Sequence, residues 1–239
     1  MDKVYNTLIR RPGNKIIAIG KNYLNHVAEM GGKEAPKKPV IFEKAFTNVV
    51  PPTEHGDSQL LTIHSNNSIH HEIELGVVIS KTMKFYNADE DWRSYIGGYF
   101  LCLDLTDRTM QAQFKKKSHP WFLSKAQDNF MPVSEFIPEK DVKDPENLDL
   151  QFNINGKVIQ KGNTKDMIFK IPILLEYISH FATLNEGDMI ITGTPEGVGP
   201  IEDKDELHGI LSEEGNTLAE LNLNVEKKPF PTMKHFSKI

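Results

Sequence analysis

Hydrophobic and polar residues alternate most regularly in two stretches, residues 148–154 and residues 219–225. A period of two places one set of side chains on each face of a strand, so both stretches predict strands with one buried face. The first leads into Asn155-Gly156, a dipeptide typical of a two-residue hairpin turn, and residues 157–160 form the return strand. The pattern therefore predicts a hairpin, and a further one-faced strand late in the chain.

Shorter apolar runs predict buried strands, because they are too short for buried helices and most of them are rich in β-branched residues. These runs lie at residues 16–20, 39–42, 100–103 and 189–192. The intervening residues 48–52 contain two adjacent prolines and predict a turn.

Helical periodicity is clear in one segment. From Ile171 to Phe181, apolar residues recur at spacings of three and four, and Pro172 suits the first turn of a helix. Residues 106–117 have a composition compatible with a helix. Residues 25–30 predict a helix of at most two turns, because two glycines follow it.

Strands outnumber helices in this reading, which predicts an α+β, β-rich fold with a few peripheral helices. Repeats, low-complexity tracts and long linkers are absent from the sequence. We expect a single domain over residues 1–239, with residues 1–15 as a short N-terminal arm.

Residues 70–79 combine two acidic side chains with a β-branched run and predict a half-buried strand that carries Glu72 and Glu74 on one face. Adjacent carboxylates repel each other and lose hydration unless a cation lies between them. A third acid, Asp104, follows the apolar run 100–103. We predict that Glu72, Glu74 and Asp104 hold one divalent metal ion. The alternative is that the two glutamates form the solvated face of an amphipathic strand.

An oxygen-only ligand set suits a hard cation such as Mg²⁺, Mn²⁺ or Ca²⁺ and argues against zinc or copper. His70 and His71 precede the acids, but the zinc motif H-E-x-x-H is absent. We expect both histidines at the surface or behind the metal ligands.

His26 and Glu29 are three residues apart in the short predicted helix, so their side chains share a face. A carboxylate that orients an imidazole raises its basicity, and this pair is suited to act as a general base on water. The alternative is an incidental charge pair on an exposed turn. Residues 31–38, rich in Gly, Lys and Pro, predict a mobile flap beside the pair.

Residues 193–199 form a glycine-rich loop directly after a predicted strand, where backbone N–H groups can approach an anion. The loop lacks the P-loop and dinucleotide-binding patterns, and a tight turn without a ligand is the alternative. Lys125 follows Pro120-Trp121 in a partly apolar setting, and by itself it reads as a surface lysine. The lysine run 115–117 is expected on a solvated face.

The chain has 239 residues, of which 26% are charged, and a net charge of −5. This balance is typical of a globular protein and offers no basic surface for nucleic acid or an anionic membrane. Apolar runs near twenty residues are absent, so no membrane span is predicted. Cys102 is the only cysteine and lies in a predicted strand, which predicts an inert core thiol.

The first fifteen residues are basic and lack a secretory apolar segment. A weak mitochondrial presequence is an alternative to a plain N-terminal arm. The expected location is the mitochondrial matrix or the cytoplasm.

An ordered set of motifs in this chain resembles the fumarylacetoacetate hydrolase family, and within it the acylpyruvase and oxaloacetate decarboxylase branch. The resemblance extends from Ile16 to about Lys227. The motifs that carry it are Gly20-Lys21-Asn22-Tyr23 with His26, residues 71–78, residues 97–104, Lys115-Lys116-Lys117, Pro120-Trp121, Met167-Ile168-Phe169 and residues 191–200. Any one of these motifs is weak, but so many in one order are specific.

The resemblance implies a mixed β-sandwich roll and a homodimer. It implies Mg²⁺ or Mn²⁺ on the three acids, with His26 and Glu29 as a water-activating pair on a closing lid. The residues that it places near the metal or the substrate are Lys125, Arg108, Gln111, Thr194 and Lys21. The chain departs from the family at Lys21, where arginine is frequent, and at Ala126-Gln127, where Ser-Phe is common.

The activity implied by the resemblance is metal-dependent cleavage of C–C bonds in small 2-oxo acids. The reactions are hydrolysis of 3-acylpyruvates, such as acetylpyruvate and fumarylpyruvate, to pyruvate and a carboxylate, and decarboxylation of oxaloacetate to pyruvate. Both form the same pyruvate enolate, and only the hydrolysis needs a water activated by His26. The alternatives are an isomerase, a fumarylacetoacetate-type hydrolase of the same family, or a non-catalytic metal-binding relative.

Overall fold

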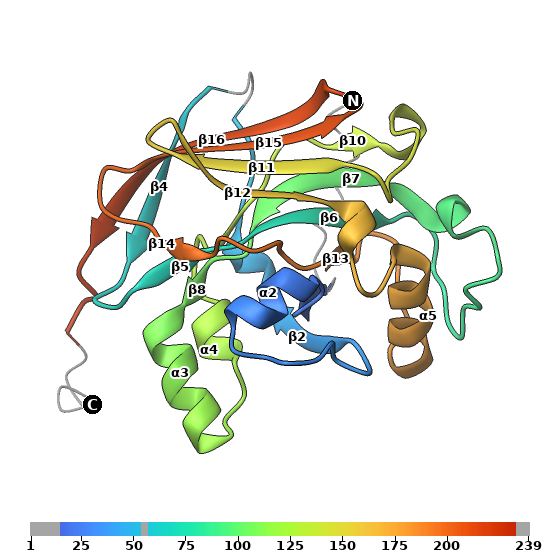
Figure 1. Ribbon diagram of the computed structural model, residues 1–239, viewed down its shortest axis with the longest axis horizontal. Coiled ribbons are helices and arrows are strands. Elements are labelled where there is room, and N and C mark those ends of the chain that lie inside the picture. The colour runs from blue at the N-terminus through green and yellow to red at the C-terminus, as the bar shows by residue number, and fades with distance from the viewer. Residues whose placement is uncertain (1–14, 54–56, 233–239) are drawn as a thin grey trace.

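The structure is a computed structural model that describes residues 15–53 and 57–232 (Figure 1). Apart from Lys15, the predicted N-terminal arm lies outside these residues. The largest sheet has six strands in the order β10-β7-β6-β13-β1-β2. Its strands are β10 (Ile137–Pro138), β7 (Ile96–Leu103), β6 (Ile73–Ile79), β13 (Met189–Ile191), β1 (Ile16–Gly20) and β2 (Val40–Lys44). The pairing of β1 with β13 is parallel and the others are antiparallel, so the sheet is mixed.

A five-stranded sheet, in the order β12-β11-β15-β16-β4, covers one face of the first (Figure 1). Its strands are β12 (Lys157–Asn163), β11 (Asp149–Ile154), β15 (Glu206–Glu213), β16 (Asn216–Lys228) and β4 (Gln59–His64). The main core lies between the two sheets and joins side chains of β6 and β7 to those of β11 and β16. This arrangement confirms the predicted β-rich α+β fold.

Two small sheets and four α-helices complete the described residues. The sheets are β14 (Gly199–Pro200), β5 (Ile69–His71) and β8 (Thr106–Asp107), and β3 (Val49–Val50) with β9 (Met131–Pro132). The α-helices are α2 (Leu24–Glu29), α3 (Arg108–Lys117), α4 (Phe122–Lys125) and α5 (Ile171–Phe181). The 3₁₀-helices are η1 (Phe46–Asn48), η2 (Trp92–Tyr95), η3 (Glu139–Asp141) and η4 (Thr164–Asp166). Helices α2, α3 and α4 lie on the side of β6 opposite the five-stranded sheet (Figure 1).

The predicted hairpin and the late one-faced strand are confirmed. Asn155 and Gly156 both have positive φ, at 51° and 77°, as a type I′ turn between β11 and β12 requires. Strand β16 alternates between buried and exposed side chains as expected, although it is longer than predicted.

The strand that carries the acids is more deeply buried than predicted. Every residue of β6 is buried, and not only one face, because the second sheet covers one side and a smaller apolar cluster covers the other. The period of two still holds: Ile73 and Leu75 face the main core, and Val78 belongs to the smaller cluster. Gly76 permits this packing, since a Cβ there would lie 2.1 Å from the Phe100 ring.

Three local predictions were wrong. Helix α3 begins at Arg108, because residues 106–107 pair as β8 and Asp107 caps the helix by accepting a hydrogen bond from the Met110 N–H at 2.8 Å. Phe181 is 78% exposed rather than part of the buried stripe of α5. The predicted turn at 48–52 contains β3, which pairs with β9.

Residues 31–38 have no helix or strand, and their predicted mobility stays a prediction. Within the described part of the chain, none of the helices has the length and apolar character needed to cross a membrane.

Candidate active site and metal centre

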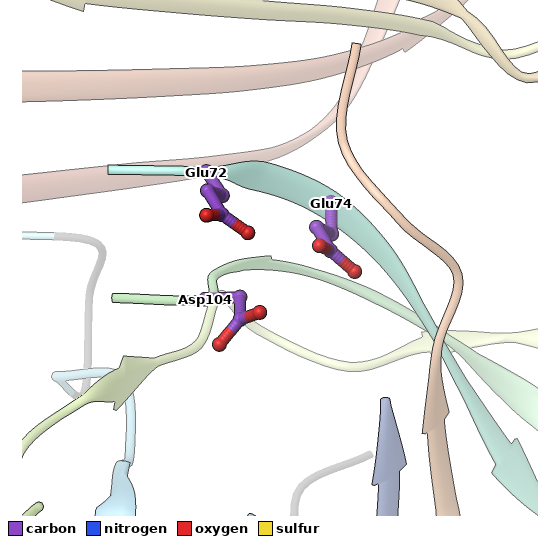
Figure 2. A group of neighbouring side chains, drawn as sticks. All are labelled: Glu72, Glu74 and Asp104. Atoms are coloured by element: carbon purple, nitrogen blue, oxygen red, sulfur yellow. The ribbon is translucent and has the colours of Figure 1, made fainter. Parts of the chain in front are cut away.

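Antiparallel pairing of β6 and β7 brings the three predicted acids together. Ile73 pairs with Leu103, and just beyond this pair the Asp104 N–H donates to the Glu72 carbonyl at 2.8 Å. Glu74 lies two residues further along, on the same side of the strand. Figure 2 shows all three carboxylates directed into one space. Their oxygens lie within 4.8 Å of one another, and all three residues are buried.

Three donors hold the Glu72 carboxylate. Arg108 Nη2 at 2.7 Å and the Thr106 hydroxyl at 3.0 Å donate to Oε1, and Lys125 Nζ donates to Oε2 at 2.8 Å. The capped start of α3 places Arg108 here, and the short helix α4 ends at Lys125. A buried glutamate held in this way has a fixed orientation.

Two buried lysines hold the Asp104 carboxylate. Lys125 Nζ donates to Oδ2 at 2.5 Å, and Lys44 Nζ donates to Oδ1 at 2.7 Å. Lys44 also donates to the Lys125 carbonyl at 2.5 Å. Glu74, by contrast, accepts a hydrogen bond from the Gly193 N–H at 2.6 Å and has no ion pair among the described residues.

The pKa shifts follow from these partners. Burial raises the pKa of Glu72, but the Lys125 and Arg108 charges outweigh it and bring the pKa below its ordinary range. Burial lowers the pKa of Lys125, yet the Asp104 and Glu72 carboxylates leave it raised. Burial, together with the charges of Asp104 and Glu72, raises the pKa of Glu74 well above its ordinary value. The three cationic side chains thus pair with Glu72 and Asp104, and Glu74 is the acid without an ion-pair partner among the described residues.

This donor set fits a divalent cation. Three convergent carboxylates offer only oxygen ligands, which suit Mg²⁺ or Mn²⁺. A cation would also relieve the repulsion that raises the Glu74 pKa, because it stabilises the ionised form of all three groups.

The predicted pair His26 and Glu29 is formed on α2. His26 Nδ1 donates to Glu29 Oε2 at 2.9 Å, which leaves Nε2 as the basic nitrogen. His26 is 5% exposed, whereas Glu29 is exposed at the surface. The other Glu29 oxygen, Oε1, accepts from the Gly197 N–H at 3.0 Å, which joins α2 to the glycine-rich loop.

A small cavity brings these groups together. It has a free volume of about 30 Å³, and Glu72, Glu74, His26 and Lys125 all line it. Its wall also includes the four residues expected near the substrate, which are Lys21, Arg108, Gln111 and Thr194. Arg108 Nη1 donates to Gln111 Oε1 at 2.7 Å. The free volume has room for about one or two waters.

Two expectations near this cavity gain detail. Lys115 is exposed as expected, and it also lines the cavity and places its ammonium 5.2 Å from the centre of the Trp121 ring. Of the two histidines expected at the surface or behind the metal ligands, His71 is fully buried and His70 is half-buried. Burial lowers the pKa of His70 to about 4.

The sequence analysis missed the roles of Lys44 and Thr106. Lys44 ends β2, and the only sequence signal is a second charge, after Glu43, at the end of an apolar run. Lysine at a strand end is usually solvated, so this signal does not identify a buried partner for Asp104. Thr106 follows Asp104 by two residues, which is the strand spacing that places both side chains on one face.

Comparison with known proteins gives consistent matches. Residues 15–226 match the family described as fumarylacetoacetate (FAA) hydrolase C-terminal. The mitochondrial oxaloacetate tautomerase FAHD1 of Bos taurus is 43% identical over 204 residues, covering 84% of this chain and 90% of that protein. The mitochondrial oxaloacetate decarboxylase of Dictyostelium discoideum is 42% identical over 205 residues, covering 84% of this chain and 88% of that protein.

A solved structure also matches over most of the chain. It is fumarylpyruvate hydrolase from Pseudomonas aeruginosa in complex with Mn²⁺ and pyruvate. The TM-score is 0.84 at 29% identity, and the match covers 90% of each chain.

Proposed function

This chain belongs to the fumarylacetoacetate hydrolase family, and on that premise we propose that it is a metal-dependent enzyme that breaks C–C bonds in small 2-oxo acids. The proposed reactions are decarboxylation of oxaloacetate and hydrolysis of 3-acylpyruvates such as acetylpyruvate and fumarylpyruvate. The observation that carries the proposal is the convergence of Glu72, Glu74 and Asp104, of which the two glutamates line the same cavity as His26 and Lys125. Residues 1–239 would form a single catalytic domain with residues 1–15 as a short N-terminal arm, and residues 15–226 of it match the family.

Glu72, Glu74 and Asp104 would hold Mg²⁺ or Mn²⁺. When bound, the cation supplies positive charge that stabilises electron density on the 2-oxo group as the C–C bond breaks. The three carboxylates keep their positions through their own partners, Lys44, Arg108 and the Gly193 N–H. A site held by its surroundings binds a cation with little rearrangement.

His26 and Glu29 would supply the base for hydrolysis. Glu29 holds the Nδ1–H, so His26 Nε2 takes a proton from water as the water oxygen bonds to C4 of the acylpyruvate. The C3–C4 bond then breaks, its electron pair goes to the pyruvate fragment, and protonation at C3 completes pyruvate. Decarboxylation of oxaloacetate releases CO₂ and leaves the same fragment without consuming water.

The cationic side chains of the cavity would bind and orient the substrate. Lys125 lies beside two of the acids, and Arg108 with Gln111 lies at the cavity wall. Thr194 and Lys21 line the same cavity and would contact a substrate carboxylate. Positive charge around a small cavity favours anionic substrates.

Steady-state assays with oxaloacetate, acetylpyruvate and fumarylpyruvate test the proposal, each with and without added Mg²⁺ or Mn²⁺ after treatment with EDTA. We expect pyruvate from at least oxaloacetate and one acylpyruvate, and only in the presence of the metal. Pyruvate formation at the uncatalysed rate from all three substrates would reject the proposal.

A second candidate is tautomerisation of oxaloacetate, which the name of the bovine relative and the proton-transfer pair His26–Glu29 favour. Here His26 would move a proton between C3 and the 2-oxo oxygen without breaking a C–C bond. Loss of the enol absorbance of oxaloacetate without pyruvate formation distinguishes tautomerisation from decarboxylation.

A homodimer is also part of the proposal. Strand β2 is an edge of the six-stranded sheet, and its exposed Ile41 lines a groove together with Phe122, which is 48% exposed. Burial of this apolar face by a second copy would remove it from water. Light scattering is expected to give twice the mass of the chain, and the mass of one chain would contradict the dimer.

The proposed location is the mitochondrial matrix or the cytoplasm, and the bovine and Dictyostelium relatives are both named as mitochondrial. Fractionation of cells that express the tagged full chain tests the location. Enrichment in a secreted or nuclear fraction would contradict it.

A further inference from the structure

Gln160 is a fully buried amide between the metal-binding strand and the glycine-rich loop. It lies on β12 of the five-stranded sheet, and none of its side chain is exposed. The mechanism above does not use it, although its two ends contact both parts of the candidate site. A buried amide held from both ends has a unique orientation and little freedom to rotate.

The oxygen of Gln160 is bonded to the strand that bears the acids. Oε1 accepts a hydrogen bond from the Ile73 N–H at 3.1 Å and another from His71 Nδ1 at 2.8 Å. The backbone donor at Ile73 establishes which end of the amide is oxygen. His71 therefore carries its proton on Nδ1, because an amide oxygen only accepts.

The nitrogen of Gln160 is bonded to the loop. Nε2 donates to the Thr194 hydroxyl oxygen at 2.9 Å and to the Pro195 carbonyl at 2.9 Å. Since a Thr194 lone pair accepts from Gln160, the hydroxyl hydrogen points elsewhere, and it has no acceptor among the described residues. Thr194 is 2% exposed and lines the cavity, so this hydrogen is available to an anion bound there.

The same loop contacts the rest of the site on both sides of Thr194. The Gly193 N–H donates to Glu74, and the Gly197 N–H donates to Glu29 of the histidine pair. The loop packs directly on β12, since a Cβ at Gly197 would lie 2.4 Å from the Ile159 carbonyl oxygen. Gln160 thus donates hydrogen bonds to Thr194 and Pro195, which lie between these two contacts.

We propose that Gln160 is a positioning residue, which makes the Thr194 hydroxyl a donor toward a substrate carboxylate and fixes residues 193–197 between Glu74 and Glu29. The inference rests on the proposed function for its substrate, a 2-oxo acid. Gln160 itself does not contact the cavity. It acts through Thr194 and through the loop.

The first test compares Gln160→Met with Gln151→Met. Gln151 lies on the neighbouring strand β11, is half-buried and bonds only Asn153 at 3.3 Å, so it is a matched control away from the cavity. Gln160→Met is expected to raise the KM for oxaloacetate about tenfold, because the substrate carboxylate loses an oriented donor. It should change kcat less than about threefold, because Thr194 does not hold the bond that breaks. Mn²⁺ affinity by calorimetry should change less than about threefold. Gln151→Met should match the wild type.

A double-mutant cycle with Thr194→Val tests whether Gln160 acts through Thr194. In the Thr194→Val background, Gln160→Met should raise KM by less than about twofold, because the hydroxyl that Gln160 orients is already absent. If the double variant raised KM by the product of the two single increases, the proposal would be overturned. A lower melting temperature with unchanged KM would overturn it as well, since that result describes a purely structural residue.

Gln160→Glu covers the case in which the methionine variant does not fold. In its ionised form the glutamate keeps an acceptor for Ile73 and His71 but cannot donate to Thr194 or Pro195, and the same rise in KM is expected at pH values where it is ionised. If the rise in KM came only from the added charge, it would multiply with the effect of Thr194→Val on KM. If it came from the lost orientation of the Thr194 hydroxyl, it would not.

Amide hydrogen exchange separates this inference from the proposed function. Residues 193–197 should exchange faster in Gln160→Met than in the wild type or Gln151→Met, whether or not the protein turns over a keto acid. A wild type without turnover would reject the proposed function and the substrate contact, while faster exchange would still support the positioning of the loop. Unchanged exchange would reject that positioning.

Discussion

At the scale of single residues, the charge of Lys44 is central to the site. Its ammonium group is buried and contacts the Asp104 carboxylate and the carbonyls of Leu105 and Lys125. Burial lowers the pKa of Lys44, and the attraction of Asp104 offsets part of that effect. Through these contacts Lys44 orients one acid and supports the backbone of α4, which presents Lys125.

Replacement of Lys44 is therefore expected to destabilise the metal-free protein. Lys44→Met leaves one oxygen of the buried Asp104 carboxylate and two carbonyls without their donor, while Lys125 still holds the other oxygen, and this costs about 3 kcal/mol in the free energy of unfolding. Urea denaturation of EDTA-treated protein measures this loss. Lys38→Met is the control, because Lys38 is exposed, and it should change stability by less than about 0.5 kcal/mol. Equal stability of the two variants would contradict the role of Lys44.

His26 separates the two proposed reactions. His26→Ala removes the base that activates water, so hydrolysis of acetylpyruvate should fall by about 100-fold or more in kcat. Decarboxylation of oxaloacetate consumes no water and should lose much less. Assays of both substrates on the same preparation provide the comparison, and equal losses in kcat would count against the shared intermediate. Exposed His119, replaced by alanine, is the control.

The sequence identified Glu72, Glu74 and Asp104 because strand periodicity and charge are local signals. It did not identify Lys44, since the burial of a lysine depends on which segments pack around the end of its strand. Here those segments are residues 104–105 and the last residue of α4, which lie far along the chain. Tertiary packing creates that environment, and no local pattern encodes it.

At the scale of elements, the loop after β13 connects the parts of the site. Gly193 has φ of +99°, and a Cβ there would lie 2.7 Å from the Cβ of Asn22. Asn22 is itself buried and donates to the Thr192 carbonyl at 2.8 Å, so it cannot easily move away. Glycine at this position brings the N–H of the loop within hydrogen-bond distance of Glu74.

Gly193→Ala should therefore lower the free energy of unfolding by more than backbone strain alone would. Gly215 has a similar φ of +82°, and a Cβ there would meet nothing within 4 Å, so Gly215→Ala isolates the strain. We expect a loss of about 1 kcal/mol for Gly215→Ala and at least about 2 kcal/mol for Gly193→Ala, from chemical denaturation. Only Gly193→Ala should also reduce kcat. Similar values for the two variants would mean that the loop tolerates displacement.

Elements with a clear apolar pattern were predictable, including the short strands β1, β2 and β13, and the two-residue strands were not. The hairpin β11–β12, strand β16 and helix α5 each repeat their pattern over several residues, so local sequence determines them. Strands β3, β8 and β9 have two residues each, and only pairing with distant partners defines them. The start of α3 at Arg108 depends on one such pairing.

At the scale of the whole molecule, folding forces three acids into one buried space. The raised pKa of Glu74 means that the folded, metal-free protein retains a proton that the unfolded chain releases near its ordinary pKa of about 4.5. At pH values between this ordinary pKa and the raised pKa of Glu74 in the folded protein, the unfolded state binds fewer protons. The free energy of unfolding therefore falls as pH rises. The acid cluster is thus a cost of folding that a bound cation would offset.

Glu74→Gln should remove this pH dependence. Between about pH 5 and about pH 7, metal-free Glu74→Gln is expected to gain stability relative to the wild type by up to about 1.4 kcal/mol for each pH unit. Urea denaturation at several pH values measures the difference. Parallel profiles of stability against pH for the two proteins would show that burial and the neighbouring carboxylates do not keep Glu74 protonated in this pH range.

The most direct test of the account is a calorimetric titration of EDTA-treated protein with Mn²⁺, alongside its turnover of oxaloacetate. The account predicts one Mn²⁺ per chain, recovery of activity in step with binding, and loss of both in Asp104→Asn. Asp128→Asn, which alters an exposed carboxylate, should behave as the wild type. Full turnover by the stripped protein, or unchanged Mn²⁺ binding in Asp104→Asn, would contradict a metal centre on Glu72, Glu74 and Asp104.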